Sequence, residues 1–203
     1  MTPRSPDLQA FLDTLQTSLC GAVAPDTAAG RMIARAFAAL ATPAAAGTVA
    51  PSSLPTNGHL GGALASAATA APAVARHAAA LGALTPRLAW HRRDGAEQVG
   101  PAFYAGHANA IVVGRGGLEP RADVLIGISL LAPTVAYPEH RHPPEEVYLV
   151  LSPGEWRQED GPWHAPGPGG IVHNRPGIRH VMRAGAAPLL ATWCLWTAAA
   201  TAE

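Results

Sequence analysis

The chain has 203 residues, with 14 basic and 14 acidic side chains and a formal net charge of zero. Its length suits one compact unit better than two independent enzymatic domains. A neutral chain has no long-range field to attract nucleic acid or an anionic membrane, so we expect neither as a partner and favour a small neutral or zwitterionic molecule.

The N-terminal segment gives no sign of export. Met1 to Asp7 lacks the apolar core and cleavage site of a secretory signal. Prolines and arginines interrupt the alanine-rich segments before any apolar run reaches membrane-spanning length. Cys20 and Cys194 are too few and too far apart to indicate a disulfide framework. We therefore expect a cytoplasmic protein, either a monomer or a homodimer.

The first part of the chain, residues 1–84, is predicted to be an α-helical subdomain. Asp26 is expected to cap a helix over 27–41, and a segment rich in Pro, Gly, Ser and Asn predicts a loop over 43–62. A further helix is predicted over 73–84. The first helix is indicated by apolar residues at three- and four-residue intervals: Leu8, Phe11, Leu12, Leu15 and Leu19.

The pattern changes after Pro86 to short runs of Val, Ile, Leu and aromatic residues between Gly, Pro and Asp clusters. No apolar period of helical length interrupts them. Strands at this spacing indicate a small antiparallel sandwich or barrel, and we place the second segment at 85–203. The expected strands are 88–91, 110–113, 124–131, 147–151, 170–173, 180–182 and 189–196.

The segment Tyr-Pro-Glu-His-Arg-His-Pro-Pro-Glu-Glu-Val-Tyr, residues 137–148, concentrates imidazoles, carboxylates and phenols. Because alternate strand residues share a face, His140 is expected to point with His142, and Glu146 with Tyr148. Val147, Leu149 and Leu151 would face the other way, into an apolar layer. Polar side chains inside a small barrel are costly unless they bind something, and this set of oxygen and nitrogen donors suits a metal ion.

These residues resemble the two cupin motifs. The first is His-x-His-x3-Glu with a later glycine, and the matching positions in both motifs are His140, His142, Glu146 and Gly154, then Gly170, Pro176, Gly177 and His180. The spacing to Gly154 is one residue longer than usual, and Ala184 stands where many cupins have Asn. More closely, His142-x3-Glu146-x-Tyr148 with His180 is similar to the cupin dimethylsulfoniopropionate (DMSP) lyases, especially the group with an N-terminal helical extension.

That resemblance implies a mainly β fold, with a small antiparallel cupin barrel, or double-stranded β-helix, after the helical subdomain. It implies four metal ligands and two residues that line the substrate pocket. It also implies one divalent or trivalent ion, Zn, Fe, Mn, Co or Ni. The implied ligands are His142, Glu146, Tyr148 and His180, and the implied pocket residues are Tyr137 and His140.

The implied reaction is β-elimination of DMSP, which breaks the C–S bond and gives dimethyl sulfide and acrylate. A metal ion holding the carboxylate would stabilise the developing charge and lower the pKa of a nearby phenol below its usual value of about 10. A tyrosinate then becomes a credible base. Tyr148 is favoured and Tyr137 is the alternative. Trp163, Trp193 and Trp196 are available to contact the cationic sulfonium.

The histidines outside the motifs are expected to have ordinary structural or surface roles. Glu139 and Glu145 are expected to be solvated or to lie behind the ligands. Two other functions stay open: a metal cupin that isomerises or oxygenates another small carboxylate, and a non-catalytic cupin that binds a small ligand. The histidines without a partner pattern are His59, His77, His91, His107, His164 and His173.

Overall fold

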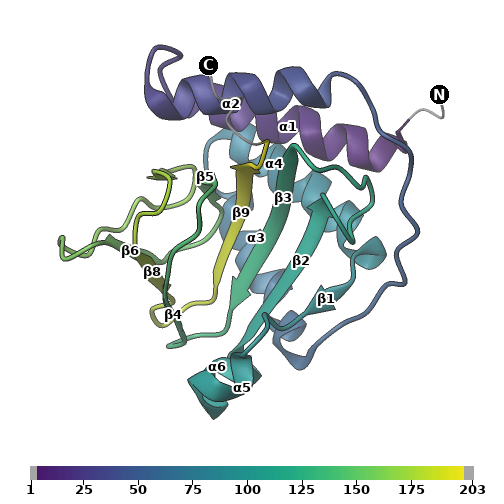
Figure 1. Cartoon of the computed structure of the whole chain (residues 1–203). Helices are drawn as coiled ribbons and strands as arrows, with labels where there is room; N and C mark the ends of the chain where they lie inside the picture. The colour runs from purple at the N-terminus through teal and green to yellow at the C-terminus, as the bar shows by residue number, and fades with distance from the viewer. Residues whose placement is uncertain (1–3, 199–203) are drawn as a thin grey trace.

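In the computed structural model, which describes residues 4–198, the helices come first in the chain and the strands follow (Figure 1). The outer ends of the two predicted segments, residues 1–3 and 199–203, lie outside the described residues. Prolines occupy the first turns of α1 and α4, where a missing N–H costs no hydrogen bond. The helical elements of this part are α1 Pro6–Ala22, α2 Ala28–Leu40, η1 Pro55–His59, α3 Leu60–Ala68, α4 Pro72–Leu84 and η2 Thr85–Arg87.

Two details of the helical part differ from the prediction. Thr27, and not Asp26, caps α2, since the Thr27 hydroxyl accepts from the Gly30 backbone N–H at 3.0 Å. The predicted loop over 43–62 contains η1 and the start of α3. Two glycines near its N-terminus weaken the helical signal of α3, but Ala63 and Ala67 are buried, so tertiary packing overrides propensity.

The strands form two antiparallel sheets. The six-stranded sheet has the order β1-β2-β3-β9-β5-β7 and the three-stranded sheet the order β4-β8-β6. Of residues 4–198, 36% lie in helices and 27% in strands or isolated bridges. The predicted cupin barrel after a helical subdomain is confirmed. The strands are β1 Trp90–His91, β2 His107–Val113, β3 Val124–Leu131, β4 Ala136–His140, β5 Glu145–Val150, β6 Glu155–Gln158, β7 Ile171–Asn174, β8 His180–Arg183 and β9 Leu189–Trp196.

The second part of the chain is less uniform than predicted. Two short helices, α5 Ala96–Val99 and α6 Pro101–Gly106, interrupt the expected run of strands. β4 and β6 were not predicted. β4 contains Pro138, which its position at the edge of the three-stranded sheet tolerates, and β6 is short and largely polar.

The six-stranded sheet separates two apolar clusters. Helices α1 and α2 cross one end of this sheet and α3 and α4 lie behind it (Figure 1). Val147, Leu149 and Leu151 pack into the cluster that contains the helices, whereas Tyr148 and Val150 belong to the cluster between the two sheets. The predicted alternation is confirmed. Because helices and sheet share one core, the division at residue 85 stays a prediction.

His77 joins the helices to the sheet. The Thr14 hydroxyl on α1 donates to the Ala10 carbonyl at 2.7 Å and so accepts from His77 Nδ1 at 3.2 Å. His77 Nε2 accepts from the Thr192 hydroxyl on β9 at 3.0 Å. Burial lowers the pKa of His77 from 6.5 to about 3, although a backbone carbonyl partly offsets it. The folded protein therefore holds this imidazole neutral.

We expect His77 to make the fold sensitive to acid. Between pH 6.5 and about 3 the unfolded chain binds a proton at this residue that the folded chain does not. Stability contributed by His77 thus falls as pH falls, by about 1.4 kcal/mol per pH unit. In urea unfolding over that range, His77→Gln should show a slope against pH smaller by that amount, and His59→Gln, at an exposed position, should not. An unchanged slope in His77→Gln would contradict this assignment.

Candidate metal centre

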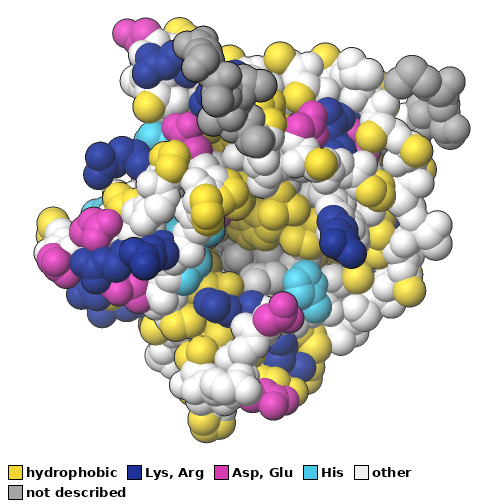
Figure 2. Space-filling model, viewed as in Figure 1, with side chains coloured by type: hydrophobic (Ala, Val, Ile, Leu, Met, Phe, Trp, Pro, Cys, Tyr) yellow, Lys and Arg dark blue, Asp and Glu magenta, His cyan; other side chains and the backbone are white. Residues whose placement is uncertain are grey.

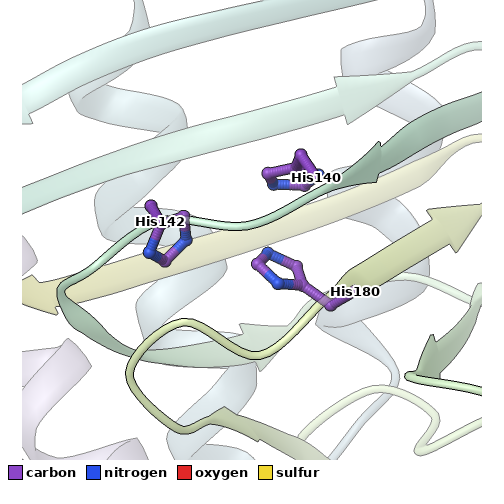
Figure 3. Close-up of side chains that lie close together, drawn as sticks. All are labelled: His140, His142 and His180. Atoms are coloured by element: carbon purple, nitrogen blue, oxygen red, sulfur yellow. The ribbon is translucent and has the colours of Figure 1, made fainter.

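Three imidazoles converge between the two sheets (Figure 3). His140 ends β4, His180 begins β8, and His142 lies in the loop after β4. One ring nitrogen from each lies within 4.8 Å of the others. The predicted strand parity of His140 and His142 is wrong, because β4 ends at His140, but the loop still brings both rings to one place.

The local backbone orients all three rings in the same way. Each Nδ1 lies within hydrogen-bond distance of a carbonyl two residues away: 3.0 Å for His140 and Pro138, 2.9 Å for His142 and Pro144, and 3.0 Å for His180 and Ile178. A carbonyl only accepts, so Nδ1 carries the proton of the neutral ring. Each Nε2 is left with a free lone pair, as a metal-binding histidine needs.

Glu146 completes the cluster from β5. Its carboxylate Oε2 lies 3.3 Å from His142 Nε2 and 3.4 Å from His180 Nε2, and the residue is 3% exposed. Among the described residues, His180 Nε2 is buried without a hydrogen-bond partner. Such an orphaned nitrogen beside a buried carboxylate is costly unless a cation lies between them. The residues therefore fit a metal ion.

The pKa shifts keep two of the three imidazoles in the neutral form that ligation requires. Burial lowers the pKa of His140 to about 4, and the neighbouring His180 contributes to this shift. Burial also lowers the pKa of His180. For His142, burial lowers the pKa, but the hydrogen bond and charge of Glu146 outweigh it and leave that pKa raised. His140 and His180 are thus neutral, the form that binds metals.

Tyr148 lies on the same face of β5 as Glu146, as predicted. It is 3% exposed, and its side chain belongs to the cluster between the sheets. Burial first, and then the charge of Glu146, raise the pKa of Tyr148 well above 10. In these surroundings alone the phenol keeps its proton.

Tyr137 stands on the opposite wall, on β4, with its ring centroid 5.0 Å from that of His140. Its phenol oxygen accepts from Asn109 Nδ2 at 3.4 Å, and Asn109 Oδ1 accepts from the Ser129 hydroxyl at 2.9 Å. Trp193 Nε1 donates to the same hydroxyl at 3.1 Å. Burial raises the pKa of Tyr137, and Asn109 partly offsets this. A hydrogen-bonded row thus crosses the inner wall of the barrel.

Of the three candidate tryptophans, Trp193 faces the interior. Trp163 stacks under the guanidinium groups of Arg157 and Arg183, and Trp196 under that of Arg35. Figure 2 shows a hollow on the viewed face, with histidine side chains on two sides of it and apolar side chains within it. Trp193 is therefore the tryptophan placed to contact a ligand.

Other predicted residues lie away from the cluster, and some important ones were missed. Glu145 pairs with His173 at 2.8 Å and Glu139 with Arg179 at 3.1 Å, so neither touches the three imidazoles. Asn174 was not predicted, yet its Nδ2 donates to Glu146 Oε2 at 2.8 Å. The sequence offered one signal for Asn174, a polar side chain close to an apolar run in a predicted strand. Asn109 in β2 carries the same signal, since it directly precedes the run from Ala110 to Val113.

Sequence comparison finds a relative that matches about half of this chain. The chain is 32% identical over 106 residues to a Cereibacter sphaeroides protein that is named as a putative dimethylsulfoniopropionate lyase, DddL. That match covers 52% of this chain and 44% of the relative, so the chain spans less than half of its length.

Two crystal structures share the whole fold. One comes from work on the DMSP lyases RdDddP and RnDddQII, with a TM-score of 0.75, 19% identity, and coverage of 97% of this chain and 95% of the other. The second is the DMSP lyase DddQ from Ruegeria pomeroyi, with a TM-score of 0.73, 23% identity, and coverage of 98% and 95%. At these identities the likeness establishes the fold.

The sequence profile of the dimethylsulfoniopropionate lyases matches residues 28–191, which include α2 to α4, most of both sheets and every residue of the cluster. The chain therefore belongs to the dimethylsulfoniopropionate lyase family.

Proposed function

We propose that the protein is a metal-dependent lyase that cleaves the C–S bond of DMSP by β-elimination. The observation that carries the proposal is the convergence of His142, Glu146 and His180, with their free lone pairs, between two buried tyrosines in the barrel. A shared fold does not fix a reaction, whereas a metal site facing two phenols suits proton removal next to a carboxylate.

The residues divide into ligands and pocket. His142, Glu146, Tyr148 and His180 would hold one transition metal ion, Zn, Fe, Mn, Co or Ni, since nitrogen and oxygen donors bind most first-row ions. Tyr137 and His140 would line the substrate pocket. The His140 ring lies between the other groups, 4.1 Å from that of His180 and 5.0 Å from that of Tyr137, so it is also close enough to serve as a further ligand.

The reaction requires a base next to the substrate carboxylate. When bound, the metal ion would act as a Lewis acid toward the carboxylate and lower the pKa of a coordinated phenol. Tyr148, as phenolate, takes the proton from the carbon next to the carboxylate. The C–H electron pair forms the double bond of acrylate, and the C–S pair leaves with dimethyl sulfide. Trp193 offers an aromatic face to the sulfonium.

The proposal extends to the surroundings of the enzyme. A neutral chain with a small buried site suits a zwitterionic substrate. The proposed enzyme is a cytoplasmic monomer or homodimer. No helix within residues 4–198 combines the length and apolarity needed to cross a membrane.

Headspace gas chromatography of the purified, metal-assayed protein with DMSP tests the proposal. Dimethyl sulfide and acrylate should appear in equal amounts. Oxygen consumption or an isomerised carboxylate without dimethyl sulfide would favour the other metal-dependent reactions. If no product forms after Zn, Fe, Mn, Co and Ni have each been restored, the lyase assignment is wrong.

A further inference from the structure

Two residues of the cluster, Glu146 and His180, are each paired with a polar residue on the adjacent strand that is not itself a proposed ligand. Glu146 on β5 is in register with Asn174 on β7. His180 on β8 is in register with Gln158 on β6. Because β7 is the edge of the six-stranded sheet and β6 the edge of the three-stranded sheet, Asn174 and Gln158 stand at the seam where the two sheets meet.

Hydrogen bonds connect these two neighbours in a fixed direction. Gln158 Nε2 lies 2.6 Å from the His173 carbonyl, which can only accept, so this end of the Gln158 amide is the donor. The same Nε2 donates to Asn174 Oδ1 at 2.6 Å. Asn174 must then turn its own Nδ2 toward Glu146, where it donates to Oε2 at 2.8 Å. A backbone carbonyl thus sets the orientation of the entire row.

The row closes into a ring. Glu146 Oε2, which receives the Asn174 donor, is also the oxygen that lies 3.4 Å from His180 Nε2. The ring has four members and four links. Strand pairing joins Glu146 to Asn174 and Gln158 to His180, an amide hydrogen bond joins Asn174 to Gln158, and the contact across the cluster joins His180 to Glu146. Asn174 is fully buried and Glu146 is nearly so. Water therefore cannot easily take the place of the Asn174 amide as the hydrogen-bond donor to the Glu146 carboxylate.

We propose that Asn174 and Gln158 are positioning residues that hold the Glu146 carboxylate at a fixed place relative to His180 across the seam between the sheets. They touch neither substrate nor metal. Their role is to preorganise a ligand pair whose members belong to different sheets. The inference rests on the metal site of the proposed function, but it requires no lyase activity.

Metal affinity tests the inference directly. Zn²⁺ affinity can be measured by competition with a chromogenic chelator, and the visible absorption band of bound Co²⁺ reports ligand geometry. Asn174→Leu should bind Zn²⁺ about 10–100-fold more weakly and show an altered Co²⁺ band, since loss of a partner behind a ligand has effects of this size. Gln158→Met, at the half-buried end of the row, should bind several-fold more weakly and serves as the second variant should Asn174→Leu not fold.

A double-mutant cycle distinguishes the loss of this hydrogen-bonded row from a general destabilisation of the site. In the Asn174→Leu background, Gln158→Met should have no further effect, because Gln158 acts through Asn174. His173→Gln is the matched control: it alters the contact with Glu145, which joins the same two strands on their opposite face, and should leave affinity and band unchanged.

Three results would overturn the inference. Asn174→Leu could bind within twofold of the unmodified protein, the two losses could simply add, or His173→Gln could weaken binding equally. Failure of the unmodified protein to bind any of these ions would instead remove the metal site and the proposed function with it. A protein that binds metal as expected but releases no dimethyl sulfide leaves the positioning role intact.

Discussion

Glu146→Gln is expected to lose its metal ion and, with it, activity toward DMSP. The substitution keeps the size of the side chain but removes the charge that faces His142 Nε2 at 3.3 Å and His180 Nε2 at 3.4 Å. Because losing a partner behind a ligand already costs about 10–100-fold, losing a ligand should lower metal affinity by more than about 100-fold. Elemental analysis of purified protein and headspace dimethyl sulfide measure the two effects.

The preceding residue provides the control. Glu145 is on the opposite face of β5, where it pairs with His173 and Arg35, so Glu145→Gln should keep both metal and activity. His142→Ala and His180→Ala should behave like Glu146→Gln. If all three variants at His142, Glu146 and His180 retain a full complement of metal, the ligand assignment is incorrect.

Tyr148→Phe should lower kcat about 10²–10⁴-fold, the usual contribution of a general base. The substitution removes the phenol that shares a strand face with Glu146, and with it one of the four proposed metal ligands, but it keeps the buried ring in place. Tyr137→Phe removes a phenol that accepts from Asn109 at 3.4 Å, and a much smaller loss is expected there. Both variants are to be assayed at saturating metal, with kcat and KM measured separately.

The comparison is informative in either direction. A larger loss in Tyr137→Phe than in Tyr148→Phe would transfer the role of base to Tyr137. If both variants keep activity within tenfold of the unmodified protein, neither of these two tyrosines is the base and His140 becomes the group to test.

Strand periodicity predicted much of the candidate site. The alternation in β5 depends only on the two-residue repeat of an extended chain, so Glu146 and Tyr148 could be assigned to one face and Val147 to the other. The distant His180 came from the resemblance to the second cupin motif. His142 was placed near His140 for the wrong reason, because it reaches the cluster from a loop.

Contacts between distant segments were beyond prediction. Asn174 and Gln158 acquire their meaning from the register of β5 with β7 and of β8 with β6, and neither register can be read from one strand. Asn109 likewise matters because β2 and β4 bring it to Tyr137. The helix α3 was missed because its stability comes from burial and not from intrinsic propensity.

The two faces of the six-stranded sheet have different surroundings: one faces the candidate metal centre and the other packs against the helices. On β9, Ala191, Trp193 and Leu195 face the barrel, whereas Leu190 and Cys194 belong to the helical core. Successive residues of one strand therefore have different neighbours: one residue lines the inside of the barrel and the next packs against the helices. Such a sheet can diversify its reactive side while its other side preserves the fold, so variation in natural or engineered relatives should follow a two-residue period along β5 and β9.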